Sequence, residues 1–487
     1  MFTKIISFLK KNLWFTPLAL GAILRLIDLT KSSIWHDEGY TMWLLRYDFA
    51  EILTRTARDV HPPMYYLISK VWVSVFGTSV FSIRFMSLLF SLGIIFLVYK
   101  IIENLFSQKA AFWSAILVAF SPFMIRFAQE ARMYGVVAFF TTLATYYFIK
   151  FVKENKNKYL VGYVLAMIVA MYTQYYSFFV IISLWAIYAI ITWKKKGLLN
   201  WKWWAANLSL LVLYLPWFPV AYRQVTRVSG SYWIQPEWIT IRTVPNNVLQ
   251  FFTYSHMDSL YNWSDILAHP AYWLLALALI ATGVVLFKSK ENRAAVLSLY
   301  IFGFLPMLLV YAVSELKTPI YQDRYFPFSA VGIFAIWGCV IAIIKSEKAK
   351  YTVATVLLVT MTMGIVYMHT DVNHQMKQLV EDVRSQAESS DEIYSGSLYT
   401  FLDSSYYMDY ADIKFISEAV DGYGESSLFY DQANEYLALP GSVGTSSDRV
   451  WVIGRVGEDY ANNSALAEWT KETVINKGTI EAVLYTK

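Results

Sequence analysis

Acidic residues that could act as a base gather early in the chain. Residues 35–39 read Trp-His-Asp-Glu-Gly and set Asp37 beside Glu38, soon after a first apolar run. Asp59 follows, two residues ahead of His61. A carboxylate can take the proton of an attacking hydroxyl, which is a poor nucleophile near neutral pH. We therefore expect Asp37 to be a base with Asp59 as its rival, although an Asp-Glu pair taken alone would also fit a solvated loop.

A second polar group lies about ninety residues further on. Residues 126–134 read Arg-Phe-Ala-Gln-Glu-Ala-Arg-Met-Tyr. Glu130 could support the base or position an acceptor. Arg126 and Arg132 suit a phosphate group, because arginine makes paired hydrogen bonds with phosphate oxygens. The alternative is an ordinary polar turn whose arginines reach toward a lipid–water interface.

A third group, at 321–327, reads Tyr-Gln-Asp-Arg-Tyr-Phe-Pro. Arg324 suits a phosphate for the same reason, and Tyr325 lies beside it. An interfacial arginine next to a tyrosine of an aromatic belt would explain the pair equally well. Arg25 and Asp28 have helical spacing, and we expect them to form a structural ion pair.

The composition indicates that these groups are held by a membrane protein. Of the 487 residues, 57% are hydrophobic and only 16% are charged, against about 25% charged in soluble domains. The charges form no basic stripe suited to nucleic acid. The single cysteine, Cys339, forms no internal disulfide and belongs to no zinc-binding spacing. The basic start of the chain resembles a signal peptide, but we interpret it as leading into an uncleaved first span.

Apolar runs predict about eleven membrane spans, each needing about 20 residues. They lie at 12–30, 83–102, 109–126, 133–151, 159–174, 176–193, 203–221, 271–287, 295–313, 325–344 and 351–369. Five lysine-rich clusters, near residues 4–11, 153–158, 194–196, 288–293 and 345–350, then fall on one side, which the positive-inside rule makes cytoplasmic. The three polar groups and the C-terminal tail fall on the opposite, extracytoplasmic side.

The apolar segment 62–77 is too short to count as a span. A helix of that length reaches only about 24 Å, whereas the hydrocarbon core is about 30 Å thick. Counting this segment as a span would also place every later lysine cluster on the extracytoplasmic side of the membrane. We expect a helix that lies in the outer interface.

The composition changes after residue 370, where polar and acidic residues increase. Strand-like runs at 392–395, 413–416, 449–454 and 480–485 alternate with helix-like stretches at 373–388 and 460–476. This alternation predicts a small α/β domain. We therefore expect an all-α polytopic transmembrane domain at 1–369 and an extracytoplasmic α/β domain at 370–487.

The ordered set of motifs resembles a known family. The Trp-His-Asp-Glu motif at 35–38, the His-Pro-Pro-Met-Tyr-Tyr motif at 61–66, the motif at 129–134 and Arg-Tyr-Phe-Pro at 324–327 are similar to those of GT-C fold membrane glycosyltransferases. The similar branch comprises dolichyl-phosphate-mannose protein mannosyltransferases, aminoarabinose transferases and RgtA/B/C/D-like proteins. The resemblance covers roughly residues 10–345. It implies an inverting transfer of a hexose or pentose from a polyprenyl-phosphate carrier to a cell-envelope glycan, lipid or protein, at the outer face of the plasma membrane.

The resemblance also assigns roles to the polar residues. It implies that Asp37, Glu38 and Glu130 are catalytic, that Arg324, Tyr325 and Arg132 bind the donor phosphate, and that Asp59, His61 and Tyr134 position the donor or acceptor. The aminoarabinose branch has a lysine where this chain has His61, which is mostly neutral at pH 7 and a weaker phosphate ligand. No cofactor or metal is expected, although Asp37 and Glu130 leave room for a shared divalent cation.

Two other functions fit parts of the sequence. A transporter or lipid flippase would place ionisable residues within the spans, whereas here they gather at the outer ends. A non-catalytic assembly or sensor protein would explain the C-terminal domain but not the acidic motif at 35–38. The sugar stays open, and so does the choice of acceptor among protein, teichoic acid, lipopolysaccharide and other cell-wall glycans.

Overall fold

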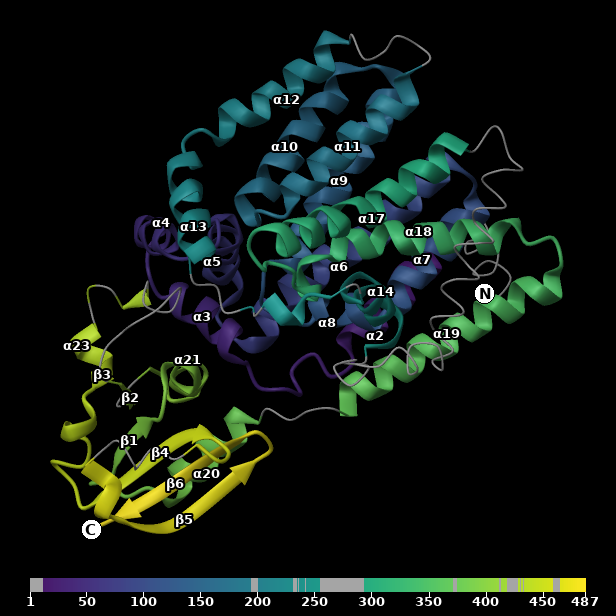
Figure 1. The fold of residues 1–487 in the computed structure, drawn as a ribbon. Coiled ribbons are helices and arrows are strands. Elements are labelled where there is room, and N and C mark those ends of the chain that lie inside the picture. The colour runs from purple at the N-terminus through teal and green to yellow at the C-terminus, as the bar shows by residue number, and fades with distance from the viewer. Residues whose placement is uncertain are drawn as a thin grey trace. The chain divides into compact units, whose positions relative to one another are not determined.

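The structure is a computed structural model, and the chain is mainly helical (Figure 1). The structure describes residues 12–193, 200–230, 234, 236–240, 242–254, 293–370, 375–410, 413–417, 428, 429, 431, 433–458 and 465–487. These residues divide into two compact units. The first comprises the chain up to Ile27 together with Arg84–Thr370, and the second comprises Asp28–Ile83 together with Asp371–Lys487.

The first unit consists of long apolar helices. They are α2 (Phe15–Leu26), α6 (Val80–Leu105), α7 (Gln108–Phe120), α8 (Pro122–Ala128), α9 (Tyr134–Glu154), α10 (Asn157–Thr173), α11 (Ser177–Thr192), α12 (Trp201–Tyr214), α13 (Phe218–Gly230), α14 (Thr243–Thr253), α17 (Arg293–Leu316), α18 (Pro327–Ile343) and α19 (Glu347–Thr370). The short helices η3 (Pro236–Trp238) and η5 (Asp323–Tyr325) lie between them. Proline opens α8 and α18 at the first helical position, where its missing N–H costs nothing.

The predicted spans agree with these helices in part. Each one falls on a helix or a bent helix pair, except 271–287, which lies outside the described residues. By length and hydropathy, four of the described helices could each cross a membrane, or six if each bent pair is one span. The bent pairs are α7 with α8 and α12 with α13. The expectation of a multi-pass membrane protein is therefore supported, whereas the number of eleven is not confirmed.

The bend between α7 and α8 explains why one sequence expectation is wrong. The two helices meet at 62°, so the last carbonyls of α7 have no following turn to bond. Buried Arg25 donates to the carbonyl oxygens of Ala119 at 2.9 Å and Val118 at 3.1 Å, and to the Ser91 hydroxyl at 2.8 Å. A cation suits a helix C-terminus. Arg25 therefore caps α7 and does not pair with Asp28, whose carboxylate instead meets Lys31 at 3.2 Å.

The second unit combines the first polar loop with the C-terminal domain. The loop forms α3 (His36–Leu44), α4 (Phe49–Arg58) and α5 (Met64–Phe76). The C-terminal part adds α20 (Met376–Gln386), α21 (Leu398–Tyr407) and α23 (Ala433–Tyr436), with short helices η6 (Pro440–Ser442) and η7 (Ala465–Glu468). At 13 residues α5 spans only about 20 Å, which fits the expectation of a non-spanning helix; its location at the interface stays a prediction.

A mixed six-stranded sheet forms the core of the C-terminal part. Its strands are β1 (Glu392–Ser395), β2 (Ile413–Ile416), β3 (Leu437–Ala438), β4 (Arg449–Arg455), β5 (Thr470–Lys477) and β6 (Ile480–Thr486). The order is β3-β2-β1-β4-β6-β5. The first four strands of that order run parallel, and β6 joins antiparallel to both β4 and β5. The small C-terminal sheet expected from the sequence is present, and its four predicted strands correspond to β1, β2, β4 and β6.

The helix expected at 460–476 is wrong, because β5 occupies Thr470–Lys477. Its β-branched residues pair with β6, from Thr470 opposite Thr486 to Lys477 opposite Ile480. The turn between them uses Gly478, whose φ of 73° is costly for other residues. Pairing with a buried neighbouring strand thus outweighs the helical composition of the segment.

Candidate functional site

The acidic motif near the start forms the first turn of α3 in the second unit. His36, Asp37 and Glu38 are its first three residues, where carboxylates are favoured by the helix dipole. Consecutive helical side chains point about 100° apart. Glu38 is fully buried, and Asp37 is half-buried. The structure thus gives Asp37, and not Glu38, the exposure that a base needs to meet a substrate.

Gly39 explains how α3 reaches α21. A Cβ atom at Gly39 would lie 2.8 Å from the backbone carbonyl of Leu402 and 3.0 Å from the backbone nitrogen of Asp403. Such distances are too short for any residue but glycine. The Trp-His-Asp-Glu-Gly motif therefore ends in glycine because the two helix backbones touch there.

Two residues of the C-terminal domain complete the surroundings of Asp37. The Tyr399 carbonyl lies 2.9 Å from His36 Nδ1, and the Tyr399 ring stacks on the His36 ring with centroids 4.2 Å apart. The guanidinium carbon of Arg455 lies 3.8 Å from the Tyr399 ring centroid. Burial raises the pKa of Tyr399, Arg455 opposes that shift, and the charge of Asp37 adds to it. The charge of Asp37 thus contributes to the electrostatic surroundings of this tyrosine.

The sequence analysis missed Tyr399 and Arg455, which lie more than 350 residues after the acidic motif. A usable signal existed in the strand pattern. Arg455 is the last residue of β4 and Tyr399 follows β1 closely, and these two strands are parallel neighbours. Functional residues of α/β sheets gather at the carboxyl ends of parallel strands.

Asp59 and His61 lie where α4 gives way to α5. Asp59 is buried and forms the C-terminal cap of α4, and His61 is half-buried. The Pro-Pro pair that follows starts α5, whose Tyr66 ring lies 6.0 Å from the Tyr40 ring of α3. The aromatic contact brings α5 against α3 within this unit.

The second motif lies in the first unit, between α8 and α9. Arg126 Nε donates to Glu130 Oε1 at 3.0 Å, and Glu130 is only 9% exposed. The Gln129 amide donates to the carbonyl oxygens of Arg25 at 3.0 Å and Ile27 at 2.7 Å. The same Arg25 caps α7. Arg25 thus fixes the bend between α7 and α8, the helix that carries Arg126. Its backbone carbonyl also anchors the turn that carries Glu130.

The third motif lies close to the second. The charge of Asp323 acts on Arg126, and the Tyr325 ring lies 6.0 Å from the Tyr134 ring. Arg324 lies 5.7 Å from the Tyr325 ring centroid. Arg132 is also buried. The structure therefore gathers the residues that the sequence assigned to a donor phosphate, together with Glu130, in one part of the first unit.

Two further residues of this group were not predicted. The Tyr176 ring lies 4.5 Å from the Tyr325 ring, and its hydroxyl donates to the Ile320 carbonyl. Gln174, at the end of α10, is 2% exposed, and within the described chain its side-chain amide atoms have no hydrogen-bond partner. A buried amide in that condition is costly and is usually satisfied by a bound molecule or water. We define Arg126, Glu130, Arg132, Tyr134, Gln174, Tyr176, Arg324 and Tyr325 as the polar cluster of the first unit.

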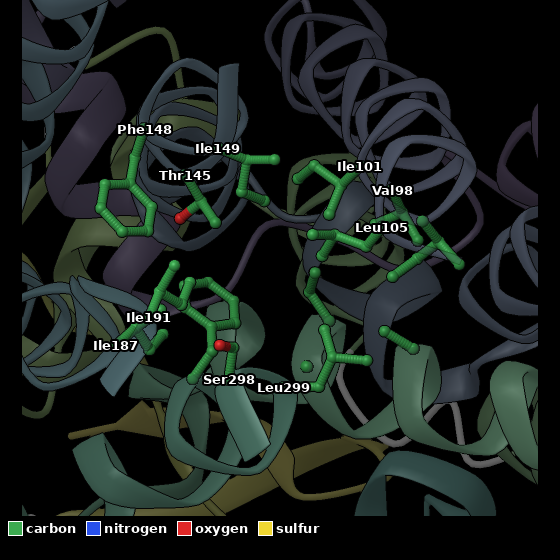
Figure 2. A pocket seen from close by; sticks show the side chains of 15 residues that line it. Val98, Ile101, Leu105, Thr145, Phe148, Ile149, Ile187, Ile191, Ser298 and Leu299 are labelled. Atoms are coloured by element: carbon green, nitrogen blue, oxygen red, sulfur yellow. The ribbon is translucent and has the colours of Figure 1, made fainter. Parts of the chain in front are cut away.

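A separate cavity of the first unit is apolar. It has a volume of about 40 Å³ and lies among α6, α9, α11, α17 and α18. Figure 2 shows the described residues that line it. Of these lining residues, only Thr145 and Ser298 carry a side-chain hydroxyl. The space is too small for a sugar, and its lining offers no titratable group. Within the part of the chain that the structure describes, no group of three or more His, Cys, Asp or Glu side chains is placed to hold a metal ion.

Comparison with known proteins agrees with this architecture. Residues 60–219 match the family model of dolichyl-phosphate-mannose-protein mannosyltransferase. No curated relative matches the sequence. ArnT from Cupriavidus metallidurans bound to undecaprenyl phosphate superposes with a TM-score of 0.61 at 12% identity, covering 97% of this chain and 98% of that chain. Its apo form gives a TM-score of 0.64 at 11% identity, covering 98% of each.

An archaeal protein shares the fold more distantly. The oligosaccharyltransferase AglB from Archaeoglobus fulgidus, in complex with an inhibitory peptide and a dolichol-phosphate, gives a TM-score of 0.51 at 10% identity, covering 97% of this chain and 74% of that chain. At these identities the likeness shows the fold, while the family model carries the sequence relationship. The motifs, the matched family and the fold agree: the chain is a membrane protein of the GT-C fold that resembles the dolichyl-phosphate-mannose protein mannosyltransferases and ArnT.

Proposed function

We propose that this protein is an inverting glycosyltransferase that moves a sugar from a polyprenyl-phosphate carrier to an extracytoplasmic acceptor in the cell envelope. The family match and the fold support a glycosyltransferase. Relatives of the same fold bind undecaprenyl phosphate and dolichol-phosphate. The acidic motif of α3 and the polar cluster supply the residue types that such a transfer requires.

The chemistry divides between the two groups of residues. An acceptor hydroxyl attacks the anomeric carbon from the face opposite the phosphate, so the configuration inverts. Asp37 takes the hydroxyl proton as the new carbon–oxygen bond forms. The bond between the anomeric carbon and the phosphate oxygen breaks, and the carrier phosphate leaves with the electron pair. Arg324 and Arg132 stabilise the charge that develops on that phosphate.

Glu130 and the tyrosines have supporting roles in this proposal. The ion pair with Arg126 holds the Glu130 carboxylate in place, with Arg126 Nε 3.0 Å from Glu130 Oε1. Tyr134 and Tyr325 are buried with their ring centroids 6.0 Å apart, and their contact holds the second and third motifs together. The buried Gln174 amide supplies a donor and an acceptor for sugar hydroxyls. His61 and Asp59, at the start of α5, position the donor or acceptor.

One observation carries the proposal furthest. The described helices of the first unit are strongly apolar, yet the polar cluster buries one arginine, a glutamate and an amide, and half-buries Arg126 and Arg324. Ionisable groups buried in a membrane protein are costly and mark functional sites. A transport pathway would distribute them along its length, whereas these belong to turns and helix ends.

The test is single-turnover transfer from a purified polyprenyl-phosphate sugar, measured on four variants of the full chain. Asp37→Asn keeps the shape and removes the basicity, and we expect transfer to fall at least about 10²-fold. Glu38→Gln, Asp59→Asn and Glu130→Gln report on the other acids. Glu468→Gln, at an exposed carboxylate of η7, is the matched control and should transfer normally.

The outcomes separate the family from the assignment of the base. Binding of the lipid donor should survive Asp37→Asn, because the phosphate ligands are intact. Near-normal transfer by Asp37→Asn, with loss in Asp59→Asn or Glu130→Gln, would refute Asp37 as the base. Failure of the unaltered protein to transfer a sugar from any polyprenyl-phosphate donor would refute the function itself.

A further inference from the structure

The second unit contains a polar cleft that the proposed mechanism does not use. Its volume is about 590 Å³. It is lined by two loop segments, around residues 30–33 and 78–80. Two segments of the C-terminal domain, on α20 and at the end of α21, line it as well. We call it the loop–domain cleft. Its cations are Lys31, Lys377 and Arg384, and its aromatic residues are Tyr406, Tyr407 and Tyr410.

Hydrogen bonds hold the tyrosines of this cleft in place. The Tyr406 hydroxyl donates to the Thr78 carbonyl at 3.1 Å, and the Tyr407 hydroxyl accepts from the Ile34 backbone nitrogen at 2.9 Å. The rings of Tyr406 and Tyr407 meet edge to face with centroids 5.0 Å apart. Tyrosines fixed in this way present flat apolar faces to a ligand at little further cost in side-chain entropy.

The polar groups of the cleft offer both donors and acceptors. Each cation has an acidic partner: Lys31 meets Asp28 at 3.2 Å, Lys377 meets Glu381 at 3.9 Å and Arg384 meets Asp409 at 3.4 Å. Each of the three cations is thus paired, and one of the three carboxylates, Asp409, lines the cleft itself. The exposed fractions of the three carboxylate side chains are 36% for Asp28, 62% for Glu381 and 87% for Asp409. Exposed ion pairs of this kind contribute little stability, so a ligand can replace them.

The backbone beside the cleft is unusual. Asp409 and Tyr410 are consecutive non-glycine residues with φ of 53° and 59°, and Asp28 has φ of 56°. Left-handed conformations cost energy in such residues and cluster at functional sites. Here they place the Asp409 carboxylate, 87% exposed, and the Tyr410 ring at the edge of the cleft.

From this arrangement we propose that the loop–domain cleft binds a saccharide chain, which is the acceptor of the transfer. A sugar hydroxyl both donates and accepts hydrogen bonds, which matches the Asp409 carboxylate set beside the Arg384 guanidinium. A sugar ring also has an apolar face of C–H groups that rests on aromatic rings. A phosphate or an anionic lipid headgroup would need donors alone and would meet the exposed Asp409 carboxylate.

That the bound saccharide is the acceptor rests on the proposed function, whereas the binding of a saccharide in the cleft does not. Residues 30–33 belong to the same loop as Asp37, so a chain held in the cleft is held by the segment that carries the proposed base. The cleft volume of about 590 Å³ exceeds what one monosaccharide fills, and it fits a ligand that extends beyond the reacting unit.

The experiment measures binding of the full chain, in lipid nanodiscs, to an array of neutral and acidic oligosaccharides. We expect at least one saccharide to bind. Lys31→Ala and Arg384→Ala should each weaken that binding about 10-fold or more, the effect of a lost hydrogen bond to a charged group. Tyr406→Phe keeps the ring and should bind, whereas Tyr406→Leu should not. Lys414→Ala, at an exposed lysine of β2 in the same unit, is the matched control and should bind normally.

Binding of no saccharide on the array would overturn the proposal, and so would binding that is unchanged in Lys31→Ala and Arg384→Ala. A parallel arm uses vesicles with and without phosphatidylglycerol. If the same variants lose binding only to the anionic vesicles, the cleft recognises a lipid headgroup and the saccharide proposal is wrong.

Kinetics separate this proposal from the function on which it rests. In the transfer reaction, Lys31→Ala should raise the KM for the saccharide acceptor and leave kcat and donor binding unchanged. A protein that binds saccharides through the cleft but transfers no sugar would refute the proposed function and keep the binding site. A protein that transfers sugar with an unchanged acceptor KM in these variants would refute the cleft as the acceptor site.

Discussion

The His36 ring lies parallel to the Tyr399 ring, with centroids 4.2 Å apart and 8° between the planes. The guanidinium of Arg455 lies 3.8 Å from the centroid of the same phenol ring, and it must occupy the opposite face, because the imidazole fills the first. His36 of the acidic motif is thus held by Tyr399 of the C-terminal domain, whose ring is held in turn by Arg455. The domain therefore does more than follow the transmembrane helices, because it fixes the helix that carries Asp37.

This stack predicts that Tyr399 is a positioning residue. Tyr399→Leu removes the ring on which His36 rests, and we expect sugar transfer to fall about 10-fold or more while donor binding is kept, since small displacements of a catalytic group are costly. Tyr399→Phe keeps the ring and should restore most of the activity. Single-turnover transfer and donor binding are the measurements. Equal activity of the Leu and Phe variants would show that the stack has no bearing on catalysis.

Gly39 gives a prediction about stability. Gly39→Ala puts a Cβ atom 2.8 Å from the Leu402 backbone, so α3 and α21 must move apart. Overpacking of this kind costs about 1–3 kcal/mol. We expect a lower melting temperature and faster proteolysis of the C-terminal domain. Gly441→Ala is the control, because the Cβ atom that it adds would have no heavy atom within 4 Å, and this variant should melt normally. A Gly39→Ala protein as stable as the control would contradict the close packing of the two helices.

Arg324 tests donor binding in the first unit. Arg324→Ala should weaken the binding of the polyprenyl-phosphate donor, and Arg324→Lys should rescue it only in part, because an ammonium lacks the planar fork of a guanidinium. Arg223→Ala, at an exposed arginine of α13, is the matched control. Donor affinity is measured by titration with the lipid phosphate. Unchanged affinity in Arg324→Ala would remove this residue from the phosphate site.

The membrane orientation is open to a direct test. The lysine clusters predict that a reporter fused after Lys348 is cytoplasmic and that one fused after Gln386 is extracytoplasmic. Paired phosphatase and fluorescent-protein fusions read the two sides. A cytoplasmic Gln386 reporter would overturn the span count and the proposed location of the active site.

The amino-acid sequence by itself was enough for the local features. Apolar runs predicted the helices, strand-like runs predicted β1, β2, β4 and β6, and residue types singled out Asp37, Glu130 and Arg324. These features depend on the period of side chains along a helix or strand and on the chemistry of single residues. The ordered motifs were likewise enough to indicate the matched family.

Only the tertiary structure decided which segments meet. The bend after α7, and not the i to i+3 spacing, determines that Arg25 caps a helix instead of pairing with Asp28. Pairing with β6 turns the segment expected as a helix into β5. The contact of α3 with α21 brings Tyr399 against His36. Each of these depends on partners distant in the chain, and the free energy of such contacts cannot be deduced from local propensity.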